Sequence, residues 1–189
     1  MDKGYQKIFW GLFIISFNIT LGIIKILPAF IGWMVILSGI NILYEEFKSE
    51  SLEVAAKYSG NLIALSLVGG ALSLFGGSTI NNSIIFTYYP IIVMIFELIM
   101  AYKILEGSIE YLRLKNQDEI AIDFEKNLRT YIVFYVIFTL SFCVALSFNI
   151  GYLLTITAIF AIILRISLMI MINRMKKMDF NIDGDETVI

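Results

Sequence analysis

Two side chains of opposite charge lie inside long apolar runs. Glu97 lies within residues 84–105 and Arg165 within residues 150–172. A carboxylate in hydrocarbon needs a partner, a proton or access to water, and a lone arginine there costs about 2.5–3.5 kcal/mol. Glu97 lies eight residues before Leu105, and Arg165 lies eight residues before Asn173, which is ~12 Å along a helix at 1.5 Å per residue. We therefore predict that they form an ion pair.

Asn18, in the first apolar run, lies at a similar depth and is the third member of this candidate polar cluster. Three interpretations are open. The cluster holds helices together, which we favour; it is a binding or coupling site; or Arg165 extends to the lipid headgroups and leaves Glu97 without it.

The composition argues against most other chemistry. The chain has no His, a single cysteine (Cys143) and a net charge of −2, which disfavours Ser-His catalysis, imidazole metal sites and nucleic-acid binding. Asp179 to Gly184 match the first half of a calcium loop, but Ile189 ends the sequence before the glutamate that such a loop requires. We expect no catalytic residue, no metal and no cofactor.

Long apolar runs must position the charged pair. Of the 189 residues, 59% are hydrophobic and 16% charged, and the mean hydropathy is +0.84. Runs of this length satisfy their backbone hydrogen bonds in lipid as helices. We predict an all-α, polytopic membrane bundle in one domain, with six transmembrane helices at about residues 8–24, 29–44, 61–75, 84–105, 128–148 and 150–172.

The first two runs are short for a full crossing, so a re-entrant hairpin is the alternative there. Residues 45–60 and 106–127 are charged but keep apolar positions, which predicts interfacial helices or linkers. Residues 174–189 are expected to form a solvated acidic tail, and Asn149 a tight turn between the last two spans.

Small residues recur every four positions at Gly69, Ser73 and Gly77. This spacing lets helix backbones approach closely. We favour packing within one chain, and dimerisation is the alternative.

Charge predicts the orientation. With six spans and a cytoplasmic N-terminus, twelve of the fourteen Lys and Arg residues fall on the inner side, and Lys25 falls outside. Because basic flanking residues favour the cytoplasm, both termini are expected there, with the protein in the plasma membrane.

The stretch from Phe9-Trp10-Gly11 to Asn18-Ile19, followed by Ile26-Leu27-Pro28-Ala29-Phe30-Ile31-Gly32-Trp33, resembles a group of small multi-span membrane proteins of Gram-positive bacteria. The likeness covers roughly the first 60 residues. Members of that group often have Asp and Tyr where this chain has Ala29 and Trp33. The resemblance implies a bacterial membrane protein and no particular activity.

These observations predict a non-enzymatic integral membrane protein that acts as an accessory or interaction subunit. Its expected partners are the lipid bilayer and a protein partner or a second copy of itself. A small-molecule transporter, or the substrate-binding subunit of one, is the alternative.

Overall fold

The computed structural model describes residues 2–16, 20–21, 24–25, 29–75 and 84–185. This part of the chain contains six helices and two short strands. They are α1 (Asp2–Ser16), β1 (Thr20–Leu21), β2 (Ile24–Lys25), α2 (Ala29–Phe47), α3 (Glu50–Phe75), α5 (Ile84–Leu114), α6 (Asp118–Ser147) and α7 (Gly151–Asp185).

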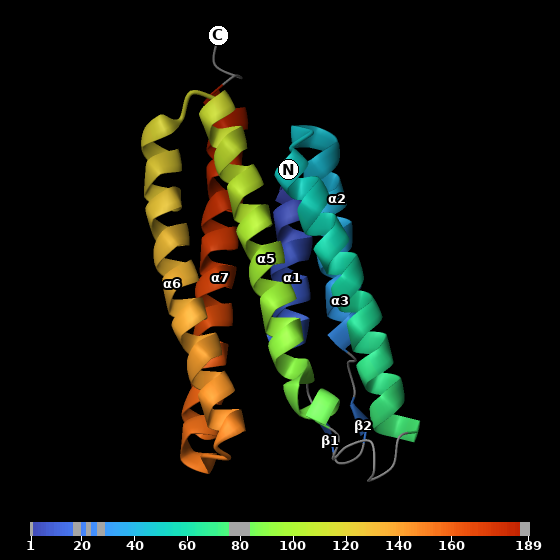
Figure 1. The fold of residues 1–189 in the computed structure, drawn as a ribbon. Helices are drawn as coiled ribbons and strands as arrows, with labels where there is room; N and C mark the ends of the chain where they lie inside the picture. The colour runs from blue at the N-terminus through green and yellow to red at the C-terminus, as the bar shows by residue number, and fades with distance from the viewer. Residues whose placement is uncertain (1, 17–19, 22–23, 26–28, 76–83, 186–189) are drawn as a thin grey trace.

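The helices form one elongated bundle in which neighbours in sequence are neighbours in space (Figure 1). Each helix packs against the next one, and α7 closes the bundle by packing against α1. α5 also contacts α2 and α7, so it lies nearest the middle. α1 begins beside the later part of α7, where Lys176 Nζ lies 3.3 Å from an Asp2 carboxylate oxygen.

Four of the described helices are long and apolar enough to cross a membrane: α2, α5 from Tyr88, α6, and α7 as far as Met178. The other two described helices, α1 and α3, are not among these four. α1 has only 15 residues, and α3 carries Glu50, Glu53 and Lys57 in its first part. The chain is therefore an all-α protein with the helices of a membrane protein.

Three residues with positive φ angles separate the long helices. Lys48 follows α2, Asn116 follows α5 and Asn149 follows α6, with φ angles of 53°, 58° and 51°. Asparagine tolerates this left-handed conformation, which lets the next backbone N–H groups reach back to the last carbonyls of the helix. Ile150 N–H, for example, donates to the Ala145 carbonyl at 3.0 Å. The predicted turn at Asn149 is confirmed.

The first predicted span, residues 8–24, is wrong in its second half. α1 ends at Ser16, and Thr20 and Leu21 pair in antiparallel fashion with Lys25 and Ile24. The β-branched residues Thr20 and Ile24 favour extended backbone. An apolar run of this length therefore contains a helix and part of a strand pair.

The two predicted interfacial segments, residues 45–60 and 106–127, are instead continuations of the neighbouring long helices. α2 runs to Phe47 and α3 starts at Glu50, while α5 runs to Leu114 and α6 starts at Asp118. Buried apolar side chains continue into these charged stretches, among them Leu52, Ala55, Ile109, Leu112, Ala121 and Phe124. These contacts keep the segments helical within the bundle.

The predicted tail, residues 174–189, also differs, because α7 continues through it as far as Asp185. Met175 is buried in the core and Lys176 pairs with Asp2, so this part of α7 packs against the rest of the bundle.

Candidate functional site

Glu97 and Arg165 form a bidentate ion pair where α5, α6 and α7 meet. Arg165 Nε donates to Glu97 Oε1 and Arg165 Nη2 donates to Glu97 Oε2, both at 3.0 Å. The Glu97 side chain is 3% exposed, whereas the Arg165 side chain is 28% exposed. The parallel, two-bond geometry matches the planar guanidinium to the carboxylate and is the strongest form of this contact.

The lengths of the two helices position this pair. Glu97 lies thirteen residues after Ile84, where α5 begins, and Arg165 lies fourteen residues after Gly151, where α7 begins. At 1.5 Å per residue these distances are ~20 and ~21 Å. Because α5 and α7 run in the same direction and both pack against α6 (Figure 1), equal distances from their starts bring the two charges to one level.

Two tyrosines of α6 lie against the pair region. The Tyr135 hydroxyl donates to the Met94 carbonyl oxygen of α5 at 3.2 Å, and the rings of Tyr131 and Tyr135 lie 5.8 Å apart. The Tyr131 hydroxyl is buried and has no hydrogen-bond partner among the described residues. An unpaired buried hydroxyl is unfavourable by ~1–3 kcal/mol unless a water or ligand meets it.

The structure describes two of the three residues of the predicted polar cluster. The structure brings Glu97 and Arg165 together, as their depths predicted. Asn18 lies outside the described residues.

The structure describes part of the predicted small-residue motif of Gly69, Ser73 and Gly77. Gly69 packs against α5, where a methyl group added to it would lie 2.7 Å from the Tyr89 hydroxyl oxygen. That hydroxyl donates to the Leu65 carbonyl oxygen at 2.7 Å, so Gly69 leaves room for a link between α3 and α5. Ser73 lies in α3, and Gly77 lies outside the described residues.

A tighter helix contact, between α1 and α2, is made by glycines that the sequence analysis missed. A methyl group on Gly11 would lie 2.7 Å from the Gly32 carbonyl oxygen, and one on Gly32 would lie 2.9 Å from the Gly11 oxygen. Gly4 and Gly39 make the same reciprocal contact, at 3.1 and 2.7 Å. The available signal was the seven-residue spacing of Gly4 and Gly11 and of Gly32 and Gly39, which places each pair on one face.

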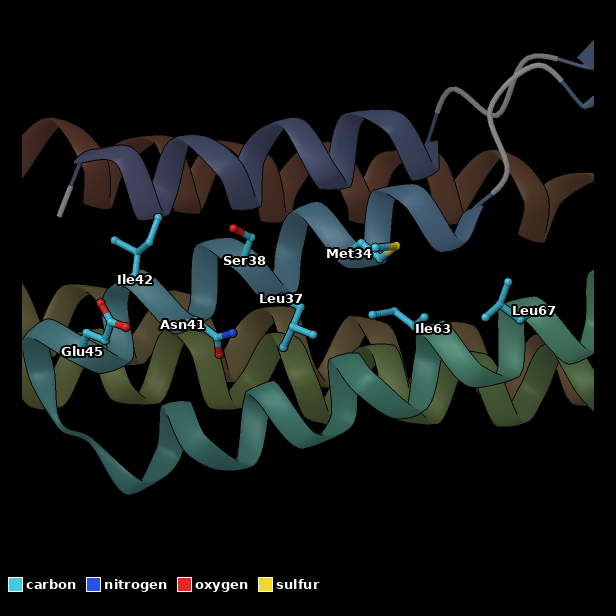
Figure 2. A pocket seen from close by; sticks show the side chains of 8 residues that line it. All are labelled: Met34, Leu37, Ser38, Asn41, Ile42, Glu45, Ile63 and Leu67. Atoms are coloured by element: carbon cyan, nitrogen blue, oxygen red, sulfur yellow. The ribbon is translucent and has the colours of Figure 1, made fainter.

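An open groove of about 630 Å³ runs along the outer face of α2, between α1 and α3 (Figure 2). Eight residues line it: Met34, Leu37, Ser38, Asn41, Ile42, Glu45, Ile63 and Leu67. Ser38 accepts a hydrogen bond from Lys7 of α1 at 2.8 Å. Asn41 is exposed on this face although it belongs to a helix of spanning length.

A second pocket, of about 300 Å³, lies between α5 and α6 near their connecting turn, and its carboxylates have partners within the protein. Glu106 accepts hydrogen bonds from the hydroxyls of Ser51 and Tyr102. Glu110 accepts from Ser49 at 2.6 Å and from Ser51 at 3.1 Å. These bonds fasten the start of α3 to α5. Within the described ranges, no three His, Cys, Asp or Glu side chains converge as a metal site requires.

Comparisons with known proteins find no counterpart: no family model, no curated protein and no solved structure matches the chain.

Proposed function

We propose that the protein is an integral membrane protein whose six helices all cross the bilayer, with both termini in the cytoplasm. All six helices run along the bundle, and α1 and α3 lie beside helices of spanning length (Figure 1). The charged contacts gather at the end where α1 begins: Lys176 with Asp2, Arg174 with Asp123, and Arg113 with Glu125. Basic residues favour the cytoplasmic side, so this end faces the cytoplasm of the cell, which we take to be bacterial.

Its role, in this proposal, is that of a non-enzymatic accessory or interaction subunit of the plasma membrane. The observation that carries the proposal is the exposed Asn41 in the groove of α2. Lipid tails offer an amide no hydrogen bond, whereas amides commonly join membrane helices to one another. An amide on an outer face therefore marks a surface that binds another helix.

Labelling of single cysteines tests the orientation. In a Cys143→Ser background, we expect Lys25→Cys to react with a membrane-impermeant maleimide on intact cells. Asn116→Cys, in the α5–α6 turn, should react only after the cells are broken. Labelling of both positions, or of neither, on intact cells would contradict six crossings.

Purification in mild detergent followed by mass spectrometry tests the role. We expect the wild-type chain to bring down a bound polypeptide, either another protein or a second copy of itself. Asn41→Leu should lose that polypeptide, whereas Val133→Leu, on the outer face of α6, should keep it. A wild-type chain that is always monomeric and alone would refute the interaction role.

A transporter or substrate-binding subunit is the second candidate, and the buried pair favours it. Arg165 is partly accessible, and the Tyr131 hydroxyl near the pair has no partner among the described residues. Charged groups inside membrane bundles commonly mark substrate or proton pathways. A small molecule that co-purifies with the wild type, is lost in Tyr131→Phe and is retained in Tyr88→Phe would support this role over the first.

A further inference from the structure

We propose that the outer face of α2 binds the same face of a second copy of this chain, forming a dimer with a twofold axis along the membrane normal. The inference rests on the proposed interaction role and names the partner. Met34, Ser38, Asn41 and Glu45 lie on this face with spacings of four, three and four residues. That is the spacing of a helix–helix seam in which two helices pack at a small angle.

The outer faces of α6 and α7 show what an apolar, lipid-facing surface of this protein looks like. The exposed large side chains of α6 from Val133 to Val144 are apolar, and so are those of α7 from Ile156 to Ile170. On α2, by contrast, Met34 is 54% exposed and shares its face with an amide and a carboxylate. This difference in polarity marks the α2 face as a contact surface.

Asn41 favours an identical partner over an unrelated one. A twofold axis along the membrane normal keeps every residue at its own depth, so Asn41 of one copy faces Asn41 of the other. An amide carries both donors and an acceptor, so two identical amides at one depth satisfy each other. The Asn41 side-chain amide forms no hydrogen bond within one copy among the described residues. A single asparagine in such a seam also fixes its register.

The charges beside the seam are complementary between two copies. Lys7 reaches the α2 face through Ser38, and Lys3 lies one helical turn before Lys7 on α1. Gly4 packs against Leu43, which places Lys3 within about one turn of Glu45 in depth. Lys3 and Glu45 are both exposed and unpaired within the described chain. Lys3 of one copy can therefore approach Glu45 of the other.

Cysteine cross-linking in native membranes tests the geometry. In a Cys143→Ser background, we expect Met34→Cys and Asn41→Cys to form disulfide dimers on mild oxidation, because the seam brings each Cα within ~7 Å of its copy. Val133→Cys is the matched control, since it is 57% exposed on the outer face of α6. It should give no dimer above the level of random collisions.

Co-purification of two differently tagged copies from one membrane tests the energetics. We expect Asn41→Leu to lower the association constant about 3- to 30-fold, the range given by one interhelical hydrogen-bonded pair. Asn41→Gln, which keeps the amide, should recover most of the association.

Each other outcome counts against a specific statement. Two tags that never co-purify, while a different protein is captured and is lost in Asn41→Leu, would overturn the dimer and leave the interaction role intact. A monomer that carries only anionic lipid would overturn both. Cross-linking that is equal at positions 34, 41 and 133 would overturn the α2 seam.

Discussion

Replacing Gly11 by alanine tests the close backbone contact between α1 and α2. The added methyl group would lie 2.5 Å from Ile36 Cγ1 and 2.7 Å from the Gly32 carbonyl oxygen. The Ile36 side chain is fully buried in the core, and a backbone carbonyl inside a helix cannot move by itself. The two helices must therefore separate to accommodate a single methyl group.

The magnitude follows from two opposing terms. Overpacking of a well-packed contact costs ~1–3 kcal/mol, whereas alanine is the better helix former by ~1 kcal/mol. Gly70→Ala carries only the helix-forming term, because a methyl group at Gly70 would meet nothing within 4 Å. The helix-forming term is common to both variants, so Gly11→Ala should be less stable than Gly70→Ala by ~1–3 kcal/mol.

Thermal unfolding in detergent, followed by tryptophan fluorescence, measures this difference. The chain has two tryptophans; Trp10 precedes Gly11 in α1, and Trp33 follows Gly32 in α2 and is buried. For a chain of this size, 1 kcal/mol corresponds to ~2–4 °C, so the two melting temperatures should differ by ~2–12 °C. Equal melting temperatures, or a higher one for Gly11→Ala, would refute the close backbone contact.

Three further changes have defined outcomes. Arg165→Leu leaves Glu97 as a buried, unpaired acid and should lower the free energy of unfolding by ~3–5 kcal/mol. Its folded yield should therefore fall well below that of the double variant Glu97→Gln/Arg165→Leu. Equal yields would mean that the two side chains do not depend on each other. Tyr89→Phe removes the hydroxyl that joins α5 to α3 and should cost ~0.5–1.5 kcal/mol in thermal unfolding, whereas Tyr88→Phe at an exposed site should have a smaller effect. Ser51→Ala removes a donor to two carboxylates and should cost ~1.5–3 kcal/mol, and an unchanged melting temperature would show that the start of α3 is held by other contacts.

The Glu97–Arg165 pair could be predicted because depth along a membrane helix can be read directly from sequence. Counting residues from the ends of two runs gave both heights, and equal heights made the pair plausible. Orientation around the helix axis is harder to predict, because it depends on which helices are neighbours. The glycine contacts of α1 with α2 depend on such a neighbour relation, and so does the outer face that carries Asn41.

The predicted segment boundaries are wrong where charged residues suggest a separate surface segment. Glu106 accepts hydrogen bonds from Lys103 of its own helix and from Ser51 of α3, so α5 continues through a charged stretch without leaving the bundle. The predicted span at residues 8–24 is wrong for the opposite reason. A uniformly apolar run contains no signal for the change from helix to strand. Hydrophobicity reports the environment of a segment more reliably than its backbone conformation.

The order in which the chain is made gives the buried ion pair a further consequence. Glu97 and Arg165 are separated by 68 residues, so at ~5–20 residues per second the ribosome needs ~3–14 s to supply the arginine after the glutamate. During that interval the acid must wait near the membrane surface or enter the lipid as an uncharged group. α7 also closes the bundle against α1, so its arrival both neutralises the acid and completes the assembly. A chain cut short before Arg165 would therefore remain an open bundle with an unpaired acid, which is the kind of defect that membrane quality control removes.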